Sequence, residues 1–121
     1  MPRIVHFEVM AENPQRAVDF YTKVFDWQVN KWNGPEDYWL VTTGADDQLG
    51  INGAIGKSQG EPLTVNVVDV PSVDEFAAKV TDHGGQVVVP KMAIPGVGYV
   101  IYCKGTEGIV FGLYQTDSSV T

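Results

Sequence analysis

The sequence predicts an α+β fold in which two β-α-β-β-β modules follow one another in tandem. Its 121 residues suit a single domain, strand-like and helix-like periodicities alternate along it, and the pattern of the first half recurs in the second. We place the first module at about residues 4–56, a linker at 57–62, the second module at about 63–114, and a frayed polar tail at 115–121. Two copies of one unit within this length are expected to share a core.

Each module contains one amphipathic helix with recognisable start signals. Asn13 can cap the first helix, with Pro14 in its first turn, and Ser72 with Glu75 forms a capping box at the start of the second. The apolar stripes correspond at a spacing of 56 residues: Ala17, Phe20, Tyr21 and Val24 in the first helix, and Val73, Phe76, Ala77 and Val80 in the second. We therefore expect the stripe, Phe20 included, to face the core.

The strands that follow the helices also recur. Gln28-Val29 and Gln86-Val87 each begin the strand after a helix, and "PEDYWLVTTG" is echoed by "PGVGYVIYCKG", each a turn followed by a strand. Gly50-Ile51 likewise recurs as Gly108-Ile109 at the start of the last strand of each module. This internal duplication is the firmest structural prediction from the sequence.

The first strand, "IVHFEVM", carries an unusual polar face. Side chains alternate between the two faces of a strand, which puts Val5, Phe7 and Val9 on one face and Ile4, His6, Glu8 and Met10 on the other. The apolar face suits a core. The imidazole and the carboxylate on the other face need a different explanation.

Composition and charge disfavour several classes of partner. Eight basic and fifteen acidic side chains give a formal charge of −7, which disfavours nucleic acid and anionic membranes, because phosphates are bound mainly by clustered Lys and Arg. The single cysteine, Cys103, cannot form an internal disulfide and is expected to be a small buried residue. No leader-like segment opens the sequence and no apolar run reaches the roughly 20 residues of a membrane span. We therefore expect a cytoplasmic protein.

The chain resembles the vicinal oxygen chelate superfamily, which contains glyoxalase I, bleomycin-resistance proteins and extradiol dioxygenases. The resemblance covers nearly the whole chain and is carried by "HFEV", "NPQRAVDFYTKVF", "DYWLVTTG", "VPKMAIPGVGY" and "EGIVFGLYQ". It is nearest to the small glyoxalase-related proteins of unassigned activity. One departure is Asp26 in "VFDW", where the family usually has Gly; Asp tolerates the left-handed conformation better than most residues.

The resemblance implies that the strands form a curved mixed sheet around an open cup, with the helices outside. It also implies that metal ligands come from the first and last strands of each module. His6 occupies one such position, whereas Leu63, Ala54 (or Gly53) and Gly112 occupy the others and cannot coordinate an ion. We therefore predict no metal and no other cofactor. A weak site made of His6 and Glu8 alone is the alternative.

The predicted ligand contacts lie on strands that would border the cup. His6 and Glu8 are the polar candidates, and aromatic side chains would supply flat apolar walls. The residues predicted to bind a ligand are His6, Glu8, Trp39, Tyr99 and Tyr114. The sequence leaves open which of Tyr38 and Trp39 faces inward. Lys91 is the one cation near the expected rim of the cup.

Three functions are compatible with these residues. The first is a metal-free protein that binds and sequesters a small organic ligand, with aromatic and cationic compounds as candidates. The second is an enzyme of the glyoxalase or dioxygenase type that uses His6 and Glu8, although no catalytic residue is assigned. The third is an accessory module with a vestigial cup. We also predict a homodimer, because pairing protects exposed sheet edges.

Overall fold

The computed structural model describes residues 2–121 and contains two compact units. One unit consists of residues 6–65, and it holds the first module together with the first three residues of the strand that begins the second module. The other consists of residues 66–121, which hold the rest of the second module, together with the N-terminal end of the first strand. No helix among the described residues is both long and apolar enough to cross a membrane.

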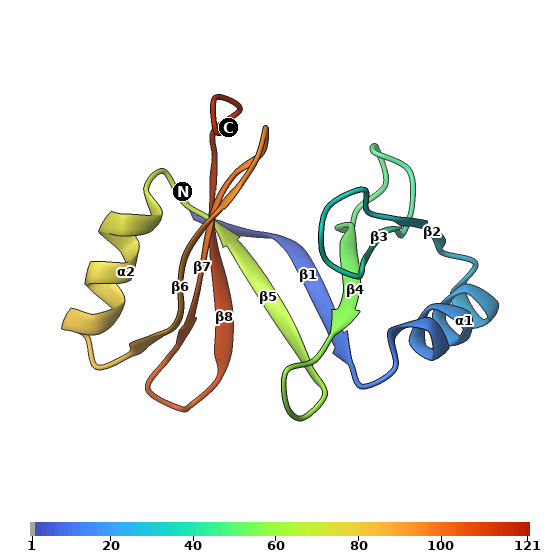
Figure 1. Ribbon diagram of the computed structural model, residues 1–121, viewed down its shortest axis with the longest axis horizontal. Coiled ribbons are helices and arrows are strands. Elements are labelled where there is room, and N and C mark those ends of the chain that lie inside the picture. Colours follow the sequence, from blue (N-terminus) through green and yellow to red (C-terminus); the bar gives the residue numbers. More distant parts are fainter. Residues whose placement is uncertain (1) are drawn as a thin grey trace. The chain divides into compact units, whose positions relative to one another are not determined.

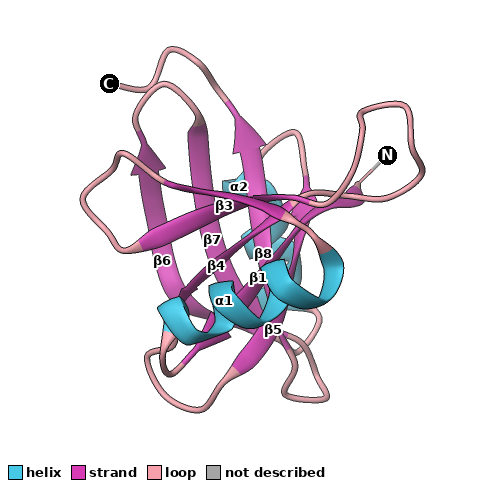
Figure 2. Ribbon diagram, turned by 90° about the vertical axis from the view of Figure 1, so that its right-hand side faces the viewer, coloured by secondary structure: helices cyan, strands magenta, loops and turns pink. Residues whose placement is uncertain are grey.

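The first module contains a mixed four-stranded sheet and one helix. Its elements are β1 (Arg3–Ala11), α1 (Pro14–Phe25), β2 (Gln28–Lys31), β3 (Tyr38–Thr42) and β4 (Gly53–Lys57). The strand order is β2-β3-β4-β1, in which β1 and β4 are parallel and the other pairs antiparallel (Figure 1). Figure 2 turns the molecule so that α1 faces the viewer.

The second module repeats this topology. Its elements are β5 (Leu63–Asp69), α2 (Val73–Asp82), β6 (Gln86–Ile94), β7 (Gly98–Lys104) and β8 (Val110–Thr116). The order β6-β7-β8-β5, with β5 and β8 parallel, corresponds strand by strand to that of the first module. The predicted α+β class and the duplicated β-α-β-β-β unit are therefore confirmed.

The helix ends follow from the residues that occupy them. The Asn13 side chain accepts a hydrogen bond from the Arg16 amide at 3.1 Å, and Ser72 accepts from the Glu75 amide at 3.2 Å, which satisfies donors that each helix start leaves free. At the end of α1, Asp26 adopts the left-handed conformation (φ 57°) and its amide donates to the Thr22 carbonyl at 3.0 Å. Asp26 therefore fills the place of the family's glycine.

The core of the first module lies between α1 and one face of its sheet. Val18, Val41 and Ile55 are buried there. Their partly buried neighbours are Phe7, Val9, Ala17, Tyr21, Trp27, Val29 and Trp39. The apolar face of β1 is therefore the face that α1 covers, as the alternation predicts.

The predicted stripe of α1 is wrong at Phe20. Its side chain is 57% exposed, and Val24 is also exposed. The helix is turned so that Val18 and Tyr21 face the sheet, and Trp27 stacks on Tyr21 with ring centroids 5.3 Å apart. The Trp27 indole thereby helps to fill the space next to the sheet, and Phe20 is left outside.

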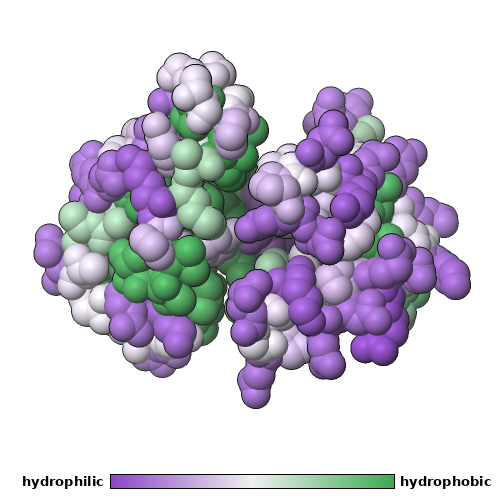
Figure 3. Space-filling model, in the orientation of Figure 1, coloured by the Kyte–Doolittle hydropathy of each residue, from purple (hydrophilic) through white to green (hydrophobic). Residues whose placement is uncertain are grey.

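The corresponding core of the second module is packed as predicted. Val70, Val73, Ile101, Cys103 and Leu113 form its buried cluster, and Phe76, Ala77 and Val80 of α2 pack against it. Cys103 is fully buried, and this burial raises the pKa of its thiol, so it is the predicted small core residue. In Figure 3 this module, at the left, shows a broad green apolar region, whereas the first module is mostly purple.

The C-terminal segment makes specific contacts with the second module. β8 extends to Thr116, and beyond it the Asp117 amide donates to the Val97 carbonyl at 2.9 Å. The Val120 side chain is buried, and its carbonyl accepts from the Gly96 amide at 2.8 Å. One apolar residue near the end of a polar segment is enough to fix it against the β6–β7 turn.

A candidate ligand-binding face on the first module

The first module has a strand face that its helix does not cover. Because α1 packs over Phe7 and Val9 of β1 and over Trp39 of β3, strand alternation directs the intervening residues to the opposite side. We call this opposite side the site face. It carries His6, Glu8 and Met10 from β1, Tyr38 and Leu40 from β3, and Ala54 and Gly56 from β4.

The polar residues of the site face are joined through one tyrosine. The Tyr38 hydroxyl donates a hydrogen bond to Glu8 Oε2 and lies 3.1 Å from His6 Nε2. Glu8 is only 5% exposed, so its carboxylate depends on such donors to replace water. The opening strand thus contributes two members of a polar network, and β3 supplies the third.

The environment of His6 keeps its imidazole neutral near pH 7. Burial lowers the pKa of His6 below the ordinary value of 6.5, and the nearby Glu8 charge opposes this shift. The net shift is downward because the removal of the ring from water outweighs its attraction to one carboxylate.

Small residues on β4 allow Tyr38 to reach across the sheet. In the strand register Gly56 lies between Met10 and Tyr38, and Ala54 lies between Glu8 and Leu40. β1 and β3 are two strand spacings apart, roughly 10 Å, a span that a tyrosine bridges only if it lies flat over the strand between. A Cβ atom at Gly56 would come within 3.2 Å of Met10 Cε and 3.3 Å of Tyr38 Cδ1.

Trp32 completes the aromatic part of this group. It precedes β3, and its ring meets Tyr38 edge to face with centroids 5.9 Å apart. Its amide donates to the Tyr38 carbonyl at 2.7 Å, so the two residues are also fixed to each other through the backbone. The Tyr38 ring is therefore packed against Trp32.

The structure places the predicted residue Trp39 on the other face of β3. Its ring packs in the cluster under α1 and has Lys31 Nζ 5.8 Å above it. The question left open by the sequence is thus decided in favour of Tyr38, which shares the site face with His6. Because adjacent residues of a strand point to opposite faces, Tyr38 and Trp39 cannot both lie on the site face.

The predicted aromatic residues of the second module lie on opposite faces of its sheet. Tyr99 packs against the cluster under α2. Tyr114 lies on the uncovered face, because its neighbours Leu113 and Gln115 contact the α2 side, and its hydroxyl donates to the Val97 carbonyl at 3.2 Å. Of the two, only Tyr114 stands on a face that its own helix leaves open.

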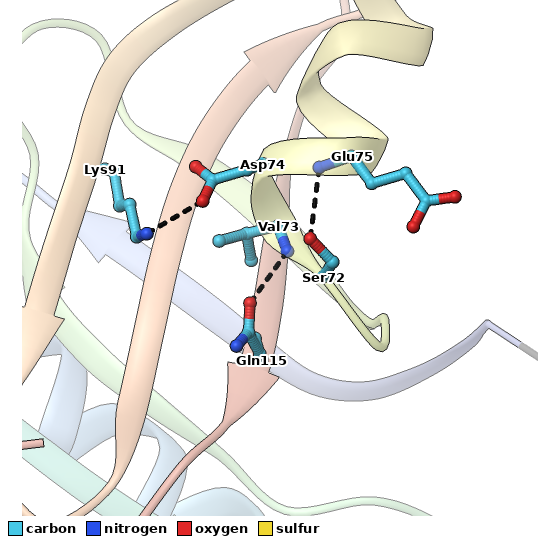
Figure 4. A network of polar contacts seen from close by, with 6 residues as sticks. All are labelled: Ser72, Val73, Asp74, Glu75, Lys91 and Gln115. Carbon is cyan, nitrogen blue, oxygen red and sulfur yellow. Dashed lines mark hydrogen bonds and ion pairs between the residues drawn. The ribbon is translucent and has the colours of Figure 1, made fainter. Parts of the chain in front are cut away.

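Lys91 is engaged by neighbours of the second module. Its ammonium group donates to Asp74 at 2.9 Å (Figure 4). It also lies 4.3 Å from the centre of the Tyr99 ring. The hydrogen bond that Lys91 donates to Asp74 is the main cause that raises the pKa of Lys91. In the same network Gln115 accepts from the Val73 amide at 3.0 Å, at the first residue of α2.

Sequence reasoning missed several residues of these faces. The predicted ligand contacts do not include Trp32, which packs on Tyr38, or Gly56, which leaves room for the Tyr38 ring. In the second module, Tyr102 lies beside Gly112 on the uncovered face: a Cβ at Gly112 would come within 3.4 Å of Tyr102 Cε1. A bulky aromatic opposite a glycine in neighbouring strands is the signal that could have identified both tyrosines.

The side chains at the ligand positions that the resemblance implies do not fit a metal ion. Leu63 and Ala54 offer no donor atom, and Gly112 has no side chain. In residues 2–121 no three His, Cys, Asp or Glu side chains are grouped so that they could hold an ion. Glu8 already accepts a hydrogen bond from Tyr38.

Comparison with known protein families identifies the superfamily of the chain. The family model of the Glyoxalase/Bleomycin resistance protein/Dioxygenase superfamily matches residues 3–113. The chain belongs to this superfamily. No protein among those with curated descriptions matches it.

Solved structures with this fold resemble the chain over 93% or more of its length. A methylmalonyl-CoA epimerase in complex with methylmalonyl-CoA and NH4+ has a TM-score of 0.69 at 14% identity, with 100% of this chain and 99% of that chain covered. A hypothetical protein from Bacillus halodurans C-125 has a TM-score of 0.70 at 10% identity, with 99% and 98% covered. The methylmalonyl-CoA epimerase from Mycobacterium tuberculosis has a TM-score of 0.65 at 9% identity, with 93% and 87% covered. At these identities the likeness establishes the fold alone.

Proposed function

We propose that this protein binds a small organic ligand at the site face without a metal ion. The observation that carries the proposal is the hydrogen-bonded group of His6, Tyr38 and Glu8 on a strand face that α1 leaves uncovered. A few fixed polar groups beside aromatic and apolar side chains are typical of small-molecule sites. Binding of a CoA derivative by a neighbour of the same fold supports a small-molecule role in general.

The aromatic contacts in this proposal differ from those expected from the sequence. Tyr38 and Trp32 take the place of Trp39, since they lie with His6 while Trp39 packs under α1. Tyr114 stays a predicted contact on the second module, and Tyr99 is a weaker one because it packs on the α2 side. Aromatic and cationic compounds remain the first candidates as ligands.

The experiment is a binding screen with His6→Ala as the matched control. Planar aromatic compounds are titrated by calorimetry into the unmodified chain and into the variant, with intact folding of both checked by circular dichroism. We expect at least one compound to bind the unmodified chain and to lose about tenfold in affinity in the variant, as removal of one charge-assisted or buried hydrogen bond does. Equal affinities for both chains would contradict the proposal.

A second candidate function is proton transfer. The observation that favours it is a neutral, half-buried imidazole beside a buried carboxylate, since such a ring can take a proton from a bound acid and Glu8 would stabilise the imidazolium. Deuterium uptake from D2O into methylmalonyl-CoA tests it with the substrate of the epimerases of this fold. Uptake that His6→Ala abolishes would place the enzyme first; we expect none above background.

We further propose that the protein is a cytoplasmic homodimer that pairs through α1. A reducing compartment suits its single, buried cysteine. Edge pairing of the sheets is disfavoured, because β2 has only four residues and β6 contains Pro90 and two register shifts. By contrast, α1 exposes Phe20, Val24 and Phe25, an apolar group that a second copy would cover.

The charges of α1 are complementary to those of an antiparallel second copy. Residues 16 and 26, and likewise 19 and 23, are equidistant in sequence from residue 21. A two-fold axis that passes the exposed side of α1 at the height of residue 21 would therefore set Arg16 opposite Asp26 and Asp19 opposite Lys23. Light scattering should give twice the 13.2 kDa of one chain. Lys23→Glu should lower this mass, and adding Asp19→Lys should restore it. The control is Lys79→Glu, the equivalent change in α2; a monomer in the unmodified chain contradicts the dimer.

A further inference from the structure

The direction of the hydrogen bonds around Tyr38 fixes the protonation of His6. Tyrosine has a single hydroxyl proton, and that of Tyr38 is donated to Glu8. In the 3.1 Å contact with His6 the Tyr38 oxygen must therefore accept, and His6 Nε2 must carry the proton. A neutral His6 is then the Nε2–H tautomer, with an unprotonated Nδ1.

This Nδ1 atom is available to a ligand. The structure gives the His6 side chain one hydrogen bond, the one at Nε2. Within residues 2–121 no buried side-chain nitrogen or oxygen lacks a partner, so an unpartnered Nδ1 must be reached by solvent. The half-buried ring thus turns a lone pair, and no proton, toward the space above the site face.

Apart from His6, the described site-face positions of β1 and β3 carry one hydrogen-bond-accepting carboxylate, that of Glu8, and no cationic side chain. The cations of neighbouring positions are engaged elsewhere: Lys31 pairs with Asp37 at 3.2 Å, and Lys57 donates to the Glu12 carbonyl at 2.6 Å. A carboxylate or phosphate placed here would meet a lone pair and a negative charge.

From these contacts we infer that the site selects ligands that donate hydrogen bonds, such as planar amidinium or protonated heteroaromatic compounds, to His6 Nδ1. The same arrangement rejects carboxylates and phosphates. This inference deepens the proposed function and rests on it. It distinguishes the chain from the methylmalonyl-CoA epimerase described above, whose bound methylmalonyl-CoA carries carboxylate and phosphate groups.

Three planar compounds of nearly equal shape test the inference. Benzamidine is a cationic donor, benzamide a neutral donor and acceptor, and benzoate an anionic acceptor. We expect benzamidine to bind at least about tenfold more tightly than benzoate, with benzamide between them, because hydrogen bonds to charged groups are the strong ones. His6→Gln and Glu8→Gln should each remove most of this preference.

A matched variant distinguishes the effect of the Glu8 charge at the site from the effect of the net charge of the chain. Glu107→Gln removes the same charge from an exposed turn of the second module and should leave the preference unchanged. Equal losses in Glu8→Gln and Glu107→Gln would overturn the inference, because the formal charge of −7 would then explain the preference. Benzoate binding as tightly as benzamidine would overturn it while leaving the proposed function intact. Failure of all three compounds to bind at millimolar concentration would count against both.

The tautomer is measurable on the unmodified chain without any ligand. The chain has two histidines, and the second makes a useful reference, because His83 Nδ1 lies 2.8 Å from the Lys79 carbonyl and must donate to it. Long-range proton–nitrogen spectra at pH 7 should show a protonated Nε2 and an unprotonated Nδ1 for His6, and a protonated Nδ1 for His83. A protonated Nδ1 on His6 would overturn the inference, whatever the binding data.

Discussion

Gly56 lies opposite Tyr38 in the register of β3 and β4, and a Cβ atom there would come within 3.3 Å of the tyrosine ring. The glycine is thus what permits the ring to lie over β4. Only in that position does the hydroxyl reach the Glu8 carboxylate and His6. The chemistry of the site face depends on a residue that contributes no side chain.

The first prediction concerns Gly56→Ala. The added methyl must push the Tyr38 ring or Met10 aside, so we expect a stability loss of roughly 1–3 kcal/mol, typical of an overpacked position. We also expect weaker benzamidine binding. Gly60→Ala is the control, because nothing lies within 4 Å of a Cβ at that position. Unchanged binding in Gly56→Ala would show that the glycine does not position Tyr38.

The second prediction concerns pH. Because burial lowers the pKa of His6 below 6.5, the unfolded chain binds the proton more tightly than the folded chain. This residue therefore contributes a loss of stability as the pH falls from about 6.5 through its folded-state pKa, and no further loss below it. Urea unfolding of the unmodified chain and of His6→Gln between pH 5 and 8 should show a steeper decline for the unmodified chain.

The third prediction separates the two causes that act on the His6 pKa. Glu8 raises this pKa against the larger effect of burial. Glu8→Gln keeps the shape and removes the charge, so the pKa of His6 should fall further in an NMR titration. A rise in that variant would mean that the carboxylate does not act on the imidazole by charge.

The fourth prediction uses the duplication as its own control. Phe20 and Phe76 occupy equivalent places in α1 and α2, yet Phe20 is exposed and Phe76 packs in the core of its module. Phe76→Ala should cost roughly 3 kcal/mol, the lower end for a buried phenylalanine, and Phe20→Ala no more than about 1 kcal/mol. Thermal melts at low protein concentration check this. A larger loss for Phe20→Ala would place it in a core after all.

The fifth prediction concerns metal ions. With leucine, alanine and glycine at three of the implied ligand positions, we expect no stoichiometric binding of nickel, zinc, manganese or iron at micromolar concentration. We also expect no turnover of the methylglyoxal–glutathione adduct. Calorimetry that detects one ion per chain, lost in His6→Ala, would move the enzyme hypothesis to first place.

The sequence by itself determined the modules, their element order and the superfamily. These follow from local physics: Asn13 and Ser72 satisfy free amides at helix starts, and Asp26 tolerates the left-handed turn. Strand alternation likewise placed His6 and Glu8 together, opposite Phe7 and Val9, because the two-residue period of a strand needs no knowledge of the rest of the fold.

The tertiary structure decided which face of each element is covered. The apolar stripe of α1 is wider than the surface of the sheet that it contacts, so some of its apolar side chains stay exposed to solvent. Trp27, which follows the helix, stacks on Tyr21 and fills space beside the sheet, and Phe20 is exposed. Tyr38 and Trp39 are adjacent aromatic residues, and the sequence does not show which of them faces His6. The packing of Trp39 under α1 places Tyr38 next to His6. The balance between burial and charge at His6 was decided there too, because desolvation depends on every atom around the ring and not on its neighbour in the sequence.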